Sequence, residues 1–148
     1  KRLGDTAPYV VMTVVKMAGR MSRDFTVEID GERFDGRYNS ISVHNMEYWG
    51  GDLLAVPGAA PDDAVLDVVR WGDVGRRDIL RAVDAQRKAN GSHLDMRGVD
   101  HHRAHSIVLS SPRLSVVERD GERGGYLPAR VGVVPAALRF LAPPNGPV

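Results

Sequence analysis

The fold class is decided by residues 25–31, which read Phe-Thr-Val-Glu-Ile-Asp-Gly. Phe25, Val27 and Ile29 alternate with polar residues, which is typical of a strand that buries one face. The Asp-Gly pair at the end of this stretch closes tight β-hairpins, because the turn needs backbone conformations with positive φ. The stretch therefore predicts a half-buried strand that leads into a hairpin.

Strand patterns continue on the C-terminal side of this hairpin. Residues 38–45 are expected to run back with Ile41 and Val43 on one face. The segment from Gly50 to Asp63 has the glycine and proline content of a loop. Further strands are predicted at residues 65–71, 102–110, 114–119, 129–134 and 138–141.

Helical signals are fewer than strand signals. Residues 75–90 are predicted as the one clear helix, with Ile79, Leu80 and Val83 on its buried face. Residues 8–19 carry the capping signals of another helix, but their β-branched side chains also suit a buried strand. We expect a helix there.

The whole chain, residues 1–148, is expected to form one domain, because it contains no internal repeat and no linker-like stretch. Its fold class is predicted as mainly β (α+β). The expected architecture is an antiparallel β-sandwich or barrel-like domain with one or two helices.

Composition excludes several functional classes. Twenty Lys and Arg residues stand against 19 Asp and Glu residues, so the net charge of +1 gives no reason to expect nucleic-acid binding. The absence of cysteine excludes disulfides, thiolate zinc sites and cysteine nucleophiles. No apolar run reaches the length of a membrane span, and no secretory signal is present, so we expect a cytoplasmic protein. The start at Lys1 is compatible with a piece of a longer protein.

Two clusters of basic residues have an ordinary and a functional interpretation. In the histidine-rich run, His101, Arg103 and His105 would share one face of a strand, and an arginine between two imidazoles favours a solvated rim over a metal site. The basic residues of the helix at 76–88 favour a solvated face over a weak attraction to an anionic membrane surface.

Two pairs of carboxylates are candidates for chemistry. Asp62 and Asp63 lie beside a turn, where carboxylates and carbonyls suit Mg²⁺ or Ca²⁺, although capping of backbone N–H groups is the favoured role. Asp-Gly-Glu at residues 120–122 places two carboxylates around a second hairpin turn. Residues 30–32 have the same sequence, so spacing alone does not separate a functional turn from a structural one.

A series of short motifs runs in a fixed order through nearly the whole chain. The motifs include residues 27–31 (Val-Glu-Ile-Asp-Gly), 42–45 (Ser-Val-His-Asn), 48–51 (Tyr-Trp-Gly-Gly), 56–59 (Val-Pro-Gly-Ala), 66–69 (Leu-Asp-Val-Val), 91–93 (Gly-Ser-His), 120–122 (Asp-Gly-Glu) and 134–138 (Val-Pro-Ala-Ala-Leu). In this order the chain resembles the C-terminal domain of the diacylglycerol kinase-like lipid kinases. That family includes bacterial diacylglycerol and phosphatidylglycerol kinases, sphingosine kinase and ceramide kinase.

The resemblance implies that this chain is the β-sandwich half of a two-domain enzyme, without the N-terminal nucleotide-binding domain. The implied reaction transfers the γ-phosphoryl group of ATP to a lipid hydroxyl in the cleft between the domains, so the isolated chain is expected to be inactive. In that reaction Asp120 would accept the proton of the lipid hydroxyl. Glu122 would help to hold Mg²⁺ or orient the acceptor. Both roles agree with what phosphoryl transfer requires.

The resemblance also implies a structural Mg²⁺ site in the loop that contains Asp63. The ligands would be the carboxylate of Asp63 and the main-chain carbonyls of Ala60 and Val65. Two residues depart from the family pattern, since Ala64 and Asp52 replace glycines. If the family's glycine has positive φ, Ala64 costs about 1 kcal/mol at that position.

Two other interpretations stay open at this point: a non-catalytic β-sandwich that binds a lipid or another ligand, and an NAD-kinase-like C-terminal domain. The partners implied by the lipid kinase interpretation are a membrane lipid substrate and the chain's own N-terminal nucleotide-binding domain. A homodimer and peripheral contact with the membrane stay open as well. The lipid itself cannot be identified, because apolar residues of an acyl cleft resemble core residues.

Overall fold

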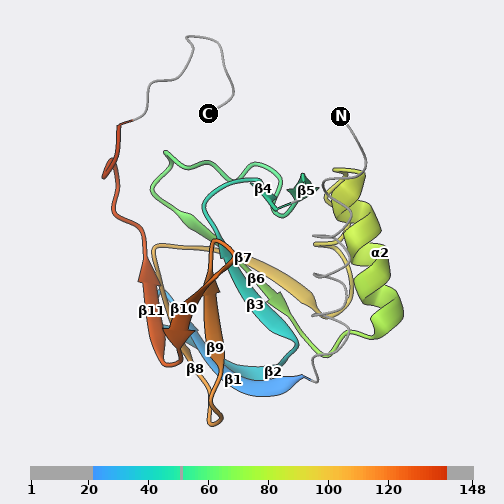
Figure 1. The fold of residues 1–148 in the computed structure, drawn as a ribbon, viewed down its shortest axis with the longest axis horizontal. Helices are drawn as coiled ribbons and strands as arrows, with labels where there is room; N and C mark the ends of the chain where they lie inside the picture. Colours follow the sequence, from blue (N-terminus) through green and yellow to red (C-terminus); the bar gives the residue numbers. More distant parts are fainter. Residues whose placement is uncertain (1–21, 51, 140–148) are drawn as a thin grey trace.

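The predicted turn forms at Asp30 and Gly31, but the strand that runs back from it lies at residues 32–38 and not at the predicted residues 38–45, because residues 40–44 pair in the other sheet. In the computed structural model, which describes residues 22–50 and 52–139, strand β1 (Arg23–Ile29) pairs antiparallel with β2 (Glu32–Tyr38). Asp30 has a φ of 47° and Gly31 a φ of 91°, the left-handed values that such a turn requires. Strands β8 (Ser106–Ser110) and β11 (Ala129–Gly132) extend the pair into a four-stranded sheet of order β11-β8-β1-β2 (Figure 1).

A second, three-stranded sheet has the order β3-β6-β7, with β3 (Ser40–His44), β6 (Leu66–Trp71) and β7 (Val99–Ala104) all antiparallel. Every residue of β6 is buried. This complete burial follows from its place in the centre of the sheet, because both of its faces are covered by other layers. The predicted strand at residues 65–71 is therefore confirmed, and it is the centre of the molecule.

Two hydrophobic clusters lie on opposite faces of the three-stranded sheet. The first fills the space between the two sheets and contains Val27, Ile29, Tyr38, Leu66, Val68, Ala104 and Ile107. The second lies between the three-stranded sheet and the helix and contains Ala55, Val56, Ala59, Val69, Trp71, Ala82 and Val99. The result is a sandwich of two antiparallel sheets with a helix as a third layer, and this confirms the predicted fold class.

The chain crosses between the two sheets at single residues. Asn39 separates β2 from β3, and its side-chain amide donates to the carbonyl of Val74 at 3.0 Å. His105 separates β7 from β8. The prediction of one continuous strand at residues 102–110 was therefore wrong, because the crossing point interrupts the backbone while the apolar pattern continues across it.

The one helix of the described residues is α2 (Arg76–Arg87), at the predicted position. Ile79 and Val83 lie on its buried face as predicted, but Leu80 is 56% exposed. Leu80 lies about 100° around the helix from Ile79, outside the buried stripe that Ala82 and Gln86 complete. The helix expected at residues 8–19 lies outside the described residues. Within the described part, no helix is long and apolar enough to cross a membrane.

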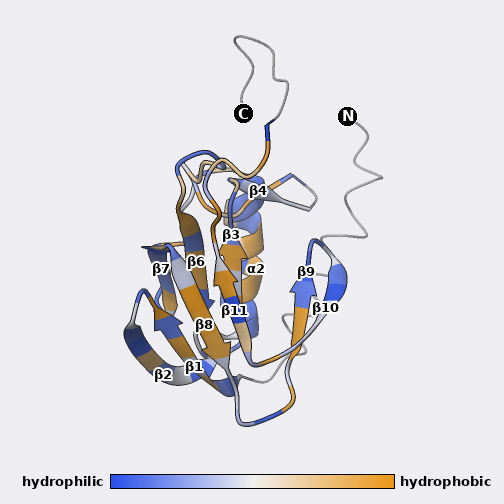
Figure 2. Cartoon of the chain, turned by 90° about the vertical axis from the view of Figure 1, so that its left-hand side faces the viewer, coloured by the Kyte–Doolittle hydropathy of each residue, from blue (hydrophilic) through white to orange (hydrophobic). Residues whose placement is uncertain are grey.

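The remaining strands are short. Strands β4 (Tyr48–Trp49) and β5 (Leu53–Leu54) pair beside the second cluster, and β5 lies within the segment predicted as a loop. Strands β9 (Val116–Arg119) and β10 (Glu122–Tyr126) form a separate two-stranded hairpin, which stands to the right of the four-stranded sheet in Figure 2. The strand predicted at residues 138–141 is wrong in its described part, since Leu138 is 73% exposed and not in a strand.

Candidate functional site

The Asp-Gly-Glu motif at residues 120–122 forms the turn of the β9–β10 hairpin. Asp120 has a φ of 50° and Gly121 a φ of 86°, within a few degrees of the values in the first hairpin. Glu122 pairs with Arg119 at the first position of β10. The two Asp-Gly-Glu motifs therefore have the same backbone geometry.

The surroundings of the first turn give its carboxylate a structural role. Asp30 accepts hydrogen bonds from the backbone N–H groups of His105 and Ser106, at 2.8 to 3.1 Å. These bonds, with smaller effects from the His105 ring, lower the pKa of Asp30. Asp30 therefore ties the hairpin to the point where the chain crosses from β7 to β8.

The carboxylates of the second turn are free of such contacts. Asp120 and Glu122 are exposed, and within residues 22–50 and 52–139 neither side chain makes a hydrogen bond or an ion pair. Further along the hairpin, the Arg123 guanidinium lies over the Tyr126 ring at 5.8 Å. Two carboxylates at the tip of a hairpin can accept a proton or hold a hard cation once another surface covers them.

The Asp63 loop has the other predicted site residue. Asp63 accepts a hydrogen bond from the backbone N–H of Val65 through Oδ1 at 3.0 Å, and its Oδ2 is bound by Nη2 of Arg103. Ala64 between them has a φ of 60°, so this position does adopt the left-handed conformation that favours glycine. The carboxylate thus caps the loop, as Asp commonly does, and also faces a cation.

These contacts bear on whether the loop could hold Mg²⁺. The described residues contain no group of three His, Asp or Glu side chains that could surround a metal ion. An ion would therefore depend on one carboxylate and on main-chain carbonyls such as those of Ala60 and Val65, which is the predicted ligand set. The carboxylate of Asp63 is a suitable ligand for a hard cation, but its Oδ2 is already bound by Arg103.

The histidine-rich run pairs with carboxylates from three other elements. Nε2 of His101 lies 2.7 Å from Oδ1 of the buried Asp67, and Nδ1 of His105 lies 3.3 Å from Oδ2 of Asp30. Arg103 completes the series through its contact with Asp63. His101 and Arg103 share a face of β7 as predicted, whereas His105 lies just beyond the strand.

The sequence patterns assigned no functional role to the polar side chains of Ser42 and His44 on β3. Nε2 of His44 lies 2.9 Å from Oγ of Ser42, and the His44 ring meets the Trp49 ring edge-on at 5.5 Å. Burial lowers the pKa of His44 to about 4, so the ring is neutral at pH 7. The alternation of Ser42 and His44 along β3 was the available signal, and it predicts only that both lie on one face.

A second group missed from the sequence lies between the two sheets. Arg70 is 6% exposed, its guanidinium stacks on the Phe34 ring at 4.0 Å, and it donates to the Tyr38 hydroxyl at 3.2 Å. Its Nη2 lies 2.9 Å from Nε2 of His102. Burial, followed by the Arg70 charge, lowers the pKa of His102, so a neutral ring accepts this hydrogen bond.

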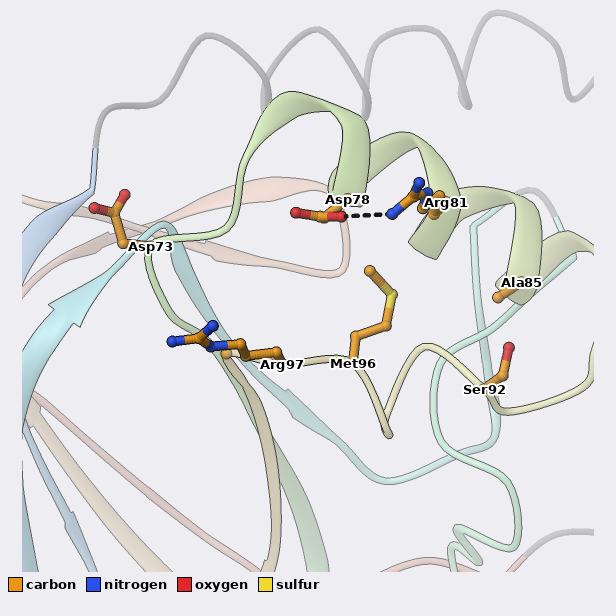
Figure 3. Close-up of a pocket in the computed structure, with 8 residues that line it drawn as sticks. Asp73, Asp78, Arg81, Ala85, Ser92, Met96 and Arg97 are labelled. Carbon is orange, nitrogen blue, oxygen red and sulfur yellow. Dashed lines mark hydrogen bonds and ion pairs between the residues drawn. The ribbon is translucent and has the colours of Figure 1, made fainter.

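A hollow of about 690 Å³ lies between α2 and the loop before β7 (Figure 3). Its lining residues are Asp73, Asp78, Arg81, Ala85, Ser92, Met96, Arg97 and Gly98. Figure 3 shows Asp78 and Arg81 paired on the helix, at 3.3 Å. None of the lining residues belongs to the β9–β10 hairpin, so the hollow is not the place where the carboxylates of that hairpin would act.

Comparison with known proteins places this arrangement in a family. The model of the YegS C-terminal NAD kinase beta sandwich-like domain matches residues 1–142. A protein named diacylglycerol kinase from Mycobacterium tuberculosis is 28% identical over 139 residues, which cover 93% of this chain and 44% of that protein. The chain thus spans less than half the length of the relative.

Solved structures show the same fold. A structure named as a "putative diacylglycerol kinase" from Bacillus anthracis superimposes with a TM-score of 0.69 at 22% identity, covering 90% of this chain and 42% of that one. A second one, named as a diacylglycerol kinase from the same organism, has a TM-score of 0.62 at 17% identity, covering 82% and 43%. The resemblance based on the ordered motifs is confirmed: the chain belongs to the YegS C-terminal domain family, the β-sandwich domain of the diacylglycerol kinase-like lipid kinases.

Proposed function

We propose that this chain is the lipid-acceptor half of an ATP-dependent lipid kinase, which transfers the γ-phosphoryl group of ATP to the hydroxyl of a diacylglycerol-like lipid. Membership of the lipid kinase family supports the reaction class, and the name of the M. tuberculosis relative supports the lipid class. A lipid substrate implies that the enzyme associates peripherally with a membrane surface.

The observation that carries the proposal is the state of the carboxylates at the β9–β10 turn. Asp120 and Glu122 are exposed at a hairpin tip and have no protein partner among the described residues. Asp120 would accept a hydrogen bond from the lipid hydroxyl and take its proton as the oxygen attacks the γ-phosphorus. Glu122, two residues further on, would orient the acceptor or hold a metal ion.

The remaining groups would come from the other part of the enzyme. The relatives are more than twice as long as the matched segment, and the missing length is where the ATP site is proposed to lie. Mg²⁺ would neutralise the phosphate charge when ATP is bound, with Glu122 as the candidate ligand on this chain. In this proposal the isolated chain is inactive, because it lacks the phosphoryl donor.

The test is Asp120→Asn in the full protein that carries this chain, with phosphate transfer from ATP to diacylglycerol measured in detergent micelles. Loss of a general base lowers kcat by roughly 100-fold to 10,000-fold. The affinity for ATP should stay within about twofold, since the nucleotide is held elsewhere. Asp30→Asn is the matched control, because it makes the same change in a turn of the same geometry, and its kcat should be retained.

Three results would count against the proposal. Near-normal turnover of the Asp120→Asn variant would remove Asp120 as the base. Equal losses in both variants would indicate a general effect of altering an Asp-Gly turn. A wild-type protein that binds lipid but transfers no phosphate to any lipid hydroxyl would instead be a non-catalytic binding module.

A further inference from the structure

The carboxylate of Asp63 is bound by a cation that belongs to the protein itself. Nη2 of Arg103 contacts Oδ2 of Asp63, and the pair is partly open to solvent, with side chains 57% and 26% exposed. The other oxygen, Oδ1, is used by the backbone N–H of Val65. The oxygen that an incoming metal ion would bind is therefore Oδ2, and Arg103 is already bound to it.

Arg103 is delivered to this oxygen by rigid structure. It lies on β7, directly opposite Asp67 of the central strand β6, and β6 begins immediately after the Asp63 loop. Both strands belong to the three-stranded sheet, which holds the backbone of Arg103 within reach of the loop. The neighbouring Asp62 is exposed and adds negative charge at the loop surface.

We propose that Arg103 is an internal competitor for the divalent cation at the Asp63 loop, so that Mg²⁺ binds there only weakly until the guanidinium moves away. This inference rests on the expectation that the loop is a Mg²⁺ site. A guanidinium and a divalent ion on the same carboxylate oxygen repel each other strongly at such short range. Only one of the two can bind this oxygen. The guanidinium is favoured, because its attachment to the chain keeps its local concentration high.

The test measures Mg²⁺ binding by calorimetry and thermal unfolding with and without EDTA, on the full protein without nucleotide. In the wild type, the expected Tm is the same in EDTA and in millimolar Mg²⁺. Arg103→Gln should bind Mg²⁺ roughly twofold to fivefold more tightly, because an exposed ion pair of this kind no longer has to be broken. Its Tm should be lower in EDTA and should rise when Mg²⁺ is added.

Three control variants make the result specific to this loop. Arg113→Gln removes an exposed positive charge elsewhere and should behave as the wild type. Asp62→Asn removes a charge from the same loop without touching the ion pair, and should keep the effect of Arg103→Gln. Adding Asp63→Asn to Arg103→Gln should abolish the gained Mg²⁺ binding. This loss would show that the additional Mg²⁺ binds at the Asp63 loop and not at the phosphoryl transfer site.

The proposal is overturned if Arg103→Gln and the wild type bind Mg²⁺ equally, whether both bind it tightly or neither binds it. It is also overturned if the gained binding survives Asp63→Asn. None of these measurements uses kinase turnover, so failure here and failure of the Asp120 assignment remain distinguishable.

Discussion

Asp30 and Asp120 occupy the same position in two turns of nearly identical backbone geometry, but among the described residues only the carboxylate of Asp30 has hydrogen-bond partners. Their φ values are 47° and 50°, and each precedes a glycine with a φ near 90°. Asp30 accepts hydrogen bonds from two backbone N–H groups where the chain crosses between the sheets, whereas Asp120 stands at the tip of a hairpin whose strands pair only with each other. The same tripeptide thus has a structural role in the first turn, whereas in the second turn its two carboxylates have no hydrogen-bond partner among the described residues.

This difference predicts that the same substitution destabilises the domain more in the first turn than in the second. Asp30→Ala should lower Tm by roughly 5 °C more than Asp120→Ala does, because only the first change leaves backbone N–H groups without their acceptor. The strain of alanine at positive φ is common to both variants, so it cancels in the comparison. Thermal unfolding followed by circular dichroism measures the difference, and equal Tm values would contradict the structural role of Asp30.

Glu122→Gln separates a metal-holding role from a base role. In the full protein, kcat at saturating Mg²⁺ should fall much less than in Asp120→Asn, while the Mg²⁺ concentration for half-maximal rate should rise several-fold, because a neutral amide is a poorer ligand for a hard cation. Initial rates over a range of Mg²⁺ concentrations give both quantities. An unchanged Mg²⁺ dependence would leave Glu122 with an orienting role only.

Acid should destabilise the domain through His44. Its pKa is lowered from 6.5 to about 4 by burial, so the unfolded chain binds more protons than the folded one between these values. Stability is therefore complete above pH 6.5 and falls as the pH approaches 4. Between pH 7.5 and pH 5, the free energy of unfolding should drop by about 2 kcal/mol from this group. His102, whose pKa is also lowered, acts in the same direction.

Urea unfolding of wild type and His44→Asn at the two pH values checks this prediction. The variant lacks a titrating group at position 44, so its stability should change less over the same range. An equally steep change in both proteins would assign the acid sensitivity to other groups.

Ala64→Gly should stabilise the domain by about 0.5–1 kcal/mol, because the native φ of 60° is strained for alanine and open to glycine. Ala89, with a φ of 49° just after α2, offers an independent test of the same sign. Ala85→Gly inside the helix is the opposite control and should cost about 1 kcal/mol. Chemical unfolding at equilibrium measures all three, and a loss of stability in Ala64→Gly would contradict the strain at that residue.

Much of the fold could be predicted from local patterns. The alternation at residues 25–29 and the Asp-Gly turn chemistry predicted strand β1 and the turn after it, and the apolar run at residues 65–71 predicted the central strand. The pattern before Gly91 predicted helix α2, although Leu80 was assigned to the wrong side of it. These signals suffice because turn conformation and strand or helix periodicity depend on neighbouring residues only.

What the sequence by itself determined is therefore strand β1 with its turn, the central strand β6, helix α2, and the ordered motifs that place the chain in its family. Tertiary structure alone decided where the chain changes sheets, at Asn39 and His105, and which Asp-Gly turn has its carboxylate bound. It also decided that Arg103 meets Asp63, 40 residues away in sequence. The physical reason is that such contacts join residues far apart in the chain, and only the packing of the two sheets and the helix brings them within hydrogen-bonding distance.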